Sequence, residues 1–239
     1  MPNHPRDFNI VIPVYEQVNL FDVASACEMF YWMGQYWDGH TVAIRLVSEN
    51  GSQVKTHAGP VLTPDESFDS YARKKIKTHL MWVPGASDDT INVMLKNTTY
   101  RNFLLAQAQV ARYVTSVCEG ALLLANAGLL DGYKATTHWS VVPCLKKFKN
   151  VTVADDYPRY VIDRNRVTGG GVSSGIDESL AIIQLIAGEK IAKQAQVVVQ
   201  YFPQPPVMGQ IPCDITCDID IPPQAGASKP AARAGAKRR

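Results

Sequence analysis

Cys118 has the sequence surroundings of a catalytic nucleophile. A β-branched run, 112–117, ends immediately before it, and an apolar helix-forming run, 119–127, begins immediately after it. This arrangement predicts a nucleophile elbow, a sharp turn that lifts one side chain above the carboxyl ends of the strands, where parallel sheets bind ligands. Gly120 would let the helix approach the strand closely, although Ser116 stands in place of the first glycine of the elbow pattern. A helix N-terminus favours thiolate over thiol; the alternative is a cysteine that only fills the core.

Two further motifs resemble cofactor or metal sites. The glycines at 169–171 precede a helix that begins at Ser174, as in a phosphate cradle, but the lysine of a P-loop is missing. A tight turn packed against the elbow is therefore the preferred interpretation. Cys213 and Cys217 have the wrong spacing for a zinc knuckle and lack a matching second pair. We expect neither a metal nor a cofactor.

The elements that would position Cys118 alternate along the chain. Short apolar runs predict strands, and longer runs with helical spacing predict helices. This alternation predicts a flavodoxin-like α/β fold, with a mostly parallel sheet and helices on both faces. We expect one domain at 5–202 and a proline-rich, then basic, extension at 203–239 that wraps the surface and ends in disorder. The expected strands are 8–14, 41–48, 79–83, 112–117, 151–154 and 160–163, and the expected helices are 22–35, 100–111, 119–127, 174–187 and 189–201.

Composition limits the partners and the compartment. The 239 residues carry a formal net charge of +2, and five of the 24 basic residues lie between Lys229 and Arg239. The rest of the chain is slightly acidic, so we expect no nucleic-acid partner and a solvated basic end. The polar start lacks the layout of a signal peptide, and no apolar stretch is long enough to span a membrane. Five widely spaced cysteines argue against a disulfide framework and for a reducing, cytoplasmic location.

Longer motifs give the chain a family resemblance. The elbow segment Ser116-Val-Cys-Glu-Gly-Ala121 is followed by a run that ends in Ala135-Thr-Thr-His-Trp139. The sequence resembles the ThiJ/PfpI superfamily, which has the class I glutamine amidotransferase-like fold. Within it, the Ala-Thr-Thr-His-Trp run and the three glycines most resemble isocyanide (isonitrile) hydratases and the ligand-binding domains of AraC-type regulators. Further matching motifs lie at 19–23, 82–85, 167–177 and 200–206, so the resemblance covers about residues 8–206.

The resemblance implies roles for two central residues. Cys118 matches the nucleophile of the family, and Asp22 matches the acidic residue that hydrogen-bonds it. A carboxyl beside a thiolate has a raised pKa and tends to keep its proton. Asp22 would then orient the sulfur and donate that proton to a carbon under attack. The alternative for Asp22 is a helix N-cap.

Five further residues complete the site that the resemblance implies. Gly85 and Ala86 match two glycines whose backbone N–H groups face the nucleophile, so Ala86 departs from the family. Glu119 departs more, because hydratase relatives carry a small hydroxyl residue there. It is either a second proton-transfer group or, preferably, a first-turn acid favoured by the helix dipole. His138 is either a base or, preferably, a structural or pocket-lining histidine, and Val172 is expected to support the pocket.

The resemblance implies hydration of an isocyanide, R–NC, to an N-substituted formamide through a thioimidate on Cys118. It also implies a small-molecule substrate, no cofactor and a homodimer. Two alternatives stay open: a glyoxalase or deglycase that acts on 2-oxoaldehydes, and a non-enzymatic ligand-binding protein or redox sensor whose cysteine oxidises. A DNA-binding regulator is disfavoured, because the sequence after Tyr201 shows no helical periodicity.

Overall fold

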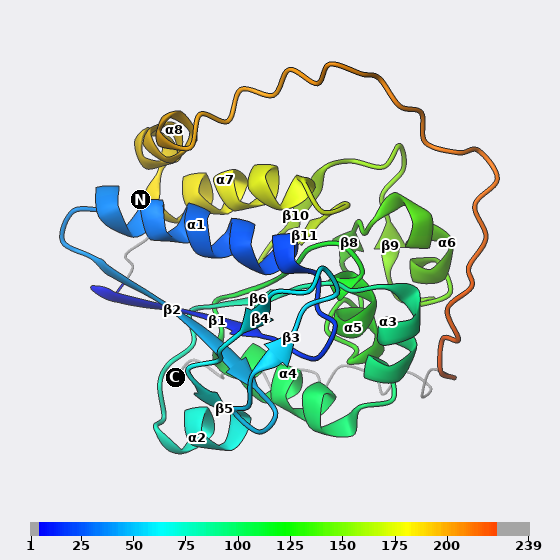
Figure 1. The fold of residues 1–239 in the computed structure, drawn as a ribbon, viewed down its shortest axis with the longest axis horizontal. Coiled ribbons are helices and arrows are strands. Elements are labelled where there is room, and N and C mark those ends of the chain that lie inside the picture. The colour runs from blue at the N-terminus through cyan, green and yellow to red at the C-terminus, as the bar shows by residue number, and fades with distance from the viewer. Residues whose placement is uncertain (1–4, 224–239) are drawn as a thin grey trace, which may run out of the picture.

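A seven-stranded sheet runs through the centre of the molecule (Figure 1). The computed structural model describes residues 5–223. The strands lie in the order β10-β11-β7-β6-β1-β2-β5, and every neighbouring pair is parallel except β10 and β11. The predicted α/β fold with a mostly parallel sheet is confirmed. The strands of this sheet are β1 (Asp7–Pro13), β2 (Thr41–Ser48), β5 (Glu66–Ser67), β6 (Leu80–Val83), β7 (Tyr113–Ser116), β10 (Tyr160–Asp163) and β11 (Arg166–Gly169).

Helices cover both faces of the sheet. Figure 1 shows α1, α7 and α8 on one face and α2, α4 and α5 on the other. The short helices η1 and α6 lie near α5, and α3 follows β6. The helices are α1 (Leu20–Tyr36), α2 (Phe68–Arg73), α3 (Asp88–Met94), α4 (Thr98–Val110), α5 (Gly120–Asn126), η1 (Trp139–Val141), α6 (Val142–Leu145), α7 (Ser174–Ala187) and α8 (Glu189–Val198), and two small strand pairs join β3 (Val54–Lys55) to β4 (Val61–Leu62) and β8 (Lys134–Ala135) to β9 (Thr152–Val153).

The central strands explain where a site can form. All residues of β6, β7 and β11 are buried, because helices cover both faces of these strands. β1, β6 and β7 are parallel neighbours, so their carboxyl ends meet at one edge of the sheet. Loops that leave this edge lead into α1, α3 and α5. In such sheets this edge is where ligands bind.

Some elements differ from their predictions. The structure has β2, β10 and α7 at the predicted bounds, and most other elements shift only at their ends. The predicted strand at 151–154 contributes β9, which pairs with β8 outside the main sheet. No strand is predicted at 166–169, yet β11 lies beside β7 in the sheet centre. An arginine at its start and a glycine at its end hide the apolar pattern by which buried strands are recognised.

A disulfide joins Cys144 to Cys217, so the prediction that these cysteines are reduced is wrong. Their Cα atoms are 4.9 Å apart although 73 residues separate them in the sequence. The chain after α8 brings them together: it runs over the surface toward α6 without regular structure, and most of its side chains are exposed (Figure 1). The cysteines therefore give no support for a reducing compartment. The basic end at 224–239 lies outside the described residues.

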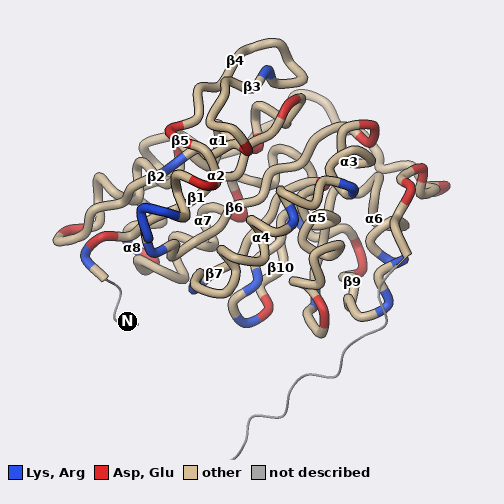
Figure 2. The backbone as a smooth tube through the Cα atoms, turned by 90° about the horizontal axis from the view of Figure 1, so that it is seen from below, with Lys and Arg blue, Asp and Glu red and all other residues tan. Residues whose placement is uncertain are grey.

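Two features are absent from residues 5–223. None of their helices is long and apolar enough to cross a lipid bilayer. Within the same residues, no three His, Cys, Asp or Glu side chains are grouped to hold a metal ion. Figure 2 shows acidic and basic positions interspersed along this part of the chain.

Candidate active site

Cys118 lies on the predicted elbow, between the last residue of β7 and the first residue of α5. Its φ of 59° lies in the left-handed region, which costs energy for a residue with a side chain and occurs mainly at functional turns. The Cys118 N–H donates to the Gly170 carbonyl at 2.8 Å, and Thr137 Oγ1 donates to the Cys118 carbonyl at 2.8 Å. A Cβ atom on Gly120 would overlap the Val83 carbonyl oxygen. Two hydrogen bonds and one close backbone contact thus fix the conformation of the elbow.

Gly85 brings two carboxyls to the nucleophile. Its N–H donates to Asp22 Oδ2 at 2.9 Å. A Cβ atom at Gly85 would lie 2.5 Å from Glu119 Oε2 and 2.8 Å from Cys118 Cβ. Real Cβ atoms do not approach other atoms so closely, so only glycine fits here. Asp22 of α1 and the adjacent elbow residues Cys118 and Glu119 therefore meet around one residue of the β6–α3 loop.

Asp22 is not the N-cap of α1. That place belongs to Asn19, whose Oδ1 accepts a hydrogen bond from the Phe21 N–H at 3.1 Å. The Asp22 side chain is fully buried, and its Oδ1 has no hydrogen-bond partner among the described residues. Burial raises the pKa of Asp22 well above its usual value, more than the Gly85 N–H lowers it. Burial thus favours the protonated carboxyl. The predicted hydrogen bond from Asp22 to the Cys118 sulfur is not found, because Oδ2 is bonded to Gly85 and Oδ1 has no partner in the described part of the chain.

The Glu119 side chain turns to the nucleophile and does not cap α5. Its carboxyl is hydrogen-bonded to the Cys118 thiol and accepts a hydrogen bond from the backbone N–H of Ala86. Burial raises the pKa of Glu119 to about 7. A carboxyl with such a pKa, in contact with a thiol, can take the proton of the thiol and return it near neutral pH. The contact fits a proton-transfer group better than the preferred prediction of a helix-dipole acid.

Burial favours the thiol form of the Cys118 sulfur. Its side chain is almost fully buried, and burial raises the pKa of Cys118 well above that of a free thiol. The carboxyls of Asp22 and Glu119 raise it further whenever they are ionised, and the backbone N–H of Val172 lowers it. Burial thus opposes the expected thiolate more than the start of a short helix favours it. Ionisation of the sulfur requires a base beside it.

The backbone donors of Gly85 and Ala86 are already used. The Gly85 N–H donates to Asp22, and the Ala86 N–H donates to Glu119. These two residues therefore position the carboxyls. The donor that faces the sulfur is the N–H of Val172.

His138 contacts Glu119. Its Nδ1 lies 2.6 Å from Ser140 Oγ and 3.7 Å from Glu119 Oε1. Burial lowers the pKa of His138, so the ring is neutral near neutral pH. The ring also fills the space beside Gly171, where a Cβ atom would overlap it. These contacts favour the pocket-lining role over a base bonded to sulfur.

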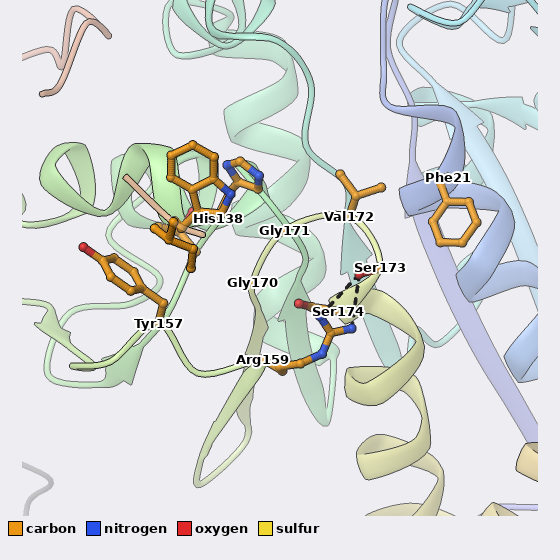
Figure 3. A pocket seen from close by; sticks show the side chains of 12 residues that line it. Phe21, His138, Tyr157, Arg159, Gly170, Gly171, Val172, Ser173 and Ser174 are labelled. Atoms are coloured by element: carbon orange, nitrogen blue, oxygen red, sulfur yellow. Dashed lines mark hydrogen bonds between the residues drawn. The ribbon is translucent and has the colours of Figure 1, made fainter. Parts of the chain in front are cut away.

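A cavity of about 480 Å³ adjoins the elbow (Figure 3). Its wall contains Thr137, Gly170 and Val172, each of which also forms a hydrogen bond with Cys118. The cavity therefore borders the elbow backbone, while the Cys118 side chain is almost fully buried and is not part of the wall. The lining residues are Phe21, Thr137, His138, Trp139, Tyr157, Arg159, Gly170, Gly171, Val172, Ser173, Ser174 and Ile211.

This geometry agrees with comparisons to known proteins. The model of the DJ-1/PfpI family matches residues 9–185, most of the chain. The chain belongs to the DJ-1/PfpI family. This confirms the resemblance inferred from the elbow and its neighbouring motifs.

Proteins that resemble this chain are named for different functions. The chain is 35% identical over 165 residues to an isonitrile hydratase of Pseudomonas putida, which covers 69% of this chain and 68% of that protein. It is 28% identical over 192 residues to the HTH-type transcriptional regulator GbdR of Pseudomonas aeruginosa, which covers 80% of this chain. The chain spans only half the length of that regulator. Family membership therefore defines the fold, and the activity has to be inferred from the residues of the site.

Solved structures in the family share the fold. A ThiJ/PfpI family protein from Pseudomonas syringae is 31% identical with a TM-score of 0.74, over 84% of this chain and 78% of the other. Drosophila melanogaster DJ-1beta is 18% identical with a TM-score of 0.68, over 81% and 98% of the two chains. At that identity the likeness concerns the fold alone.

Three residues of this DJ-1/PfpI site are not predicted from the sequence. Thr137 lies in the quoted Ala-Thr-Thr-His-Trp run, which could have indicated it. Tyr15 follows β1 at the ligand-binding edge, and its hydroxyl donates to the Pro84 carbonyl at 2.9 Å. Glu178 lies fully buried on α7 and contacts the position where a Gly169 side chain would be. A glutamate in a helix ordinarily indicates an exposed face, so no sequence signal marks Glu178.

Proposed function

We propose that this chain is an isocyanide hydratase, which converts R–NC and water into R–NH–CHO. The main support is the grouping of the Cys118 thiol with two buried carboxyls, Asp22 and Glu119, around Gly85. Hydration of an isocyanide needs a nucleophile for the terminal carbon and protons for that carbon and for the nitrogen. One thiol and two acids of different pKa supply these groups. The name of the Pseudomonas putida relative supports the same chemistry.

In the first half of the reaction, the sulfur attacks the terminal carbon. The Cys118 thiol gives its proton to the Glu119 carboxylate as the C–S bond forms, and the Val172 N–H stabilises the sulfur while it is negative. Asp22, which burial keeps protonated, donates its proton to the same carbon. The product is a thioimidate, R–N=CH–S–Cys118. Asp22 is then a carboxylate and Glu119 an acid.

In the second half, water releases the product. The Asp22 carboxylate takes a proton from water as the water oxygen attacks the carbon, and Glu119 donates its proton to the nitrogen. This gives R–NH–CH(OH)–S–Cys118. The C–S bond then breaks, and the hydroxyl proton returns to the sulfur through Glu119. One water is consumed, R–NH–CHO leaves, and all three residues recover their starting protonation states.

Replacement of the nucleophile tests the proposal. We expect Cys118→Ala to lower formation of N-cyclohexylformamide from cyclohexyl isocyanide by at least about 10³-fold, because no other group can form the thioimidate. Product is measured by chromatography against the authentic formamide. Cys213→Ala, which removes an exposed free cysteine, is the matched control and should keep full activity. Comparable turnover by Cys118→Ala would reject the mechanism.

The same preparations discriminate the alternatives. A parallel assay with methylglyoxal tests action on 2-oxoaldehydes, which would also use Cys118. A redox sensor is less well supported, because burial raises the pKa of the Cys118 thiol and the thiolate is the form that oxidises. Sulfinate at Cys118 after mild peroxide treatment, detected by mass spectrometry, together with no turnover of either substrate would favour the sensor.

A further inference from the structure

The segment that follows α8 is anchored at both ends. We call residues 203–216 the strap. Before it, the Tyr201 hydroxyl donates to Asp177 Oδ2 at 2.8 Å, which ties the chain to α7. After it, Cys217 forms the disulfide with Cys144 of α6. The strap therefore follows a fixed path over the surface, from α8 to the side of the molecule where α6 lies (Figure 1).

The second anchor extends beyond the disulfide. Ile219 is buried in the core, and the Asp220 N–H donates to Asn92 Oδ1 at 2.8 Å. The Asp220 carboxylate also lies 3.3 Å from the Lys96 ammonium. These contacts fix the end of the strap against α3 as well as α6, although the strap itself contains no helix or strand.

One strap side chain reaches the cavity beside Cys118. The strap side chains Val207 and Met208 are 76% and 90% exposed. Ile211 is 45% exposed, and it lines the cavity. Ile211 is therefore the strap side chain that lies in the cavity wall.

Three aromatic side chains lie in the other walls of the cavity, among glycines and polar residues. Phe21 comes from α1, Trp139 from η1 and Tyr157 from the loop before β10. Figure 3 shows Phe21 on one side of the cavity and Tyr157 on the other. The cation in the wall, Arg159, is ion-paired with Asp177, so its charge is already balanced. Ring faces and a branched aliphatic side chain favour an apolar, ring-bearing ligand over an anion.

We propose that the strap is a selectivity element: Ile211 contacts the R group of the isocyanide, and the Cys144–Cys217 disulfide holds Ile211 there. This inference rests on the proposed function and names its substrate class, isocyanides with an apolar cyclic R group. The disulfide acts close to the cavity, because Cys144 lies on α6 directly after η1, which carries Trp139. A cross-link removes conformational freedom from the segment that it closes, so it keeps Ile211 in the wall.

Substitutions of different size at Ile211 test the contact. Ile211→Trp should fill part of the cavity and lower kcat/KM for cyclohexyl isocyanide far more than for methyl isocyanide, so that the ratio of the two values falls by about tenfold or more. Ile211→Ala should lower kcat/KM for cyclohexyl isocyanide by about threefold to tenfold through a higher KM, and should improve the relative rate for a naphthyl isocyanide. Met208→Trp and Met208→Ala, at an exposed strap position, are the matched controls and should keep the wild-type ratios.

Removal of the disulfide tests the anchor. Cys217→Ser should lower the cyclohexyl-to-methyl ratio in the same direction as Ile211→Ala, because the strap no longer holds its side chain in the wall. Cys213→Ser, which removes a free cysteine of the same strap, should keep the wild-type ratio. Intact mass after thiol alkylation confirms that the wild-type protein contains the disulfide.

The outcomes distinguish this inference from the proposed function. A wild-type protein that hydrates no isocyanide refutes the proposed function. A wild-type protein that hydrates isocyanides with a size ratio unaffected by Ile211→Trp and Ile211→Ala refutes the role of the strap alone. Equal effects of the Ile211 and Met208 substitutions would also refute it. If the Ile211 variants alter the ratio and Cys217→Ser does not, Ile211 contacts the substrate but the disulfide does not hold it in place.

Discussion

Glu119 gives the site a titrating group close to neutral pH. Burial raises its pKa to about 7, and its carboxyl is hydrogen-bonded to the Cys118 thiol. Because only the carboxylate accepts the thiol proton, kcat/KM should rise as the pH increases through about 7 and fall below it. Glu119→Gln has the same size but cannot accept that proton, so it should lower kcat/KM by about 10²–10⁴-fold and remove this limb of the profile. A pH–rate profile with cyclohexyl isocyanide measures both effects.

His138 is the control for this assignment, because its Nδ1 lies 3.7 Å from Glu119 Oε1. Burial lowers the pKa of His138 below 6.5, so an imidazole limb would appear at lower pH than that of Glu119. The limb near pH 7 should persist in His138→Asn. A limb that survives in Glu119→Gln and disappears in His138→Asn would instead assign the base to the imidazole.

The close packing of two elements, β6 and α5, sets the elbow. A Cβ atom on Gly120 would overlap the Val83 carbonyl oxygen, which is backbone and cannot rotate away. Gly120→Ala should therefore push α5 from the sheet, destabilise the protein by about 1–3 kcal/mol and displace Cys118 enough to lower turnover. Urea denaturation and the formamide assay measure the two effects. Gly209→Ala, where a Cβ atom would meet open space, should change neither; a Gly120→Ala protein with wild-type stability and turnover would contradict this account.

How far the sequence predicts the site also follows from its elements. The elbow and its glycine are predictable because a strand run, Cys118 and a helix run are adjacent in the chain. The bounds of α7 are predictable from its apolar spacing. The contact of Glu119 with the thiol is not, because it depends on how the β6–α3 loop packs at Gly85. The Cys144–Cys217 disulfide is likewise not predictable from the sequence, because the whole fold and the strap are needed to bring the two cysteines together.

At the scale of the whole molecule, buried acids make stability depend on pH. Glu178 is fully buried, neither carboxyl oxygen has a hydrogen-bond partner among the described residues, and burial raises its pKa well above 4.5. The folded state therefore keeps a proton that the unfolded state releases above about pH 4. By linkage, the free energy of unfolding falls as the pH rises from there toward the folded pKa, by at most about 1.4 kcal/mol per pH unit for this one proton.

Glu178→Gln tests this source of pH dependence, because it retains the shape of Glu178 and removes its ionisation. The free energy of unfolding, measured by urea denaturation between about pH 5 and about pH 8, should therefore fall less steeply with pH in the variant than in the wild type. Glu28→Gln, at an exposed position of α1, is the matched control and should keep the wild-type slope. The Cys118 chemistry does not use Glu178, so formamide production should continue in Glu178→Gln. Parallel slopes in Glu178→Gln and the wild type would show that Glu178 releases its proton equally in both states, against its burial between α7 and β11.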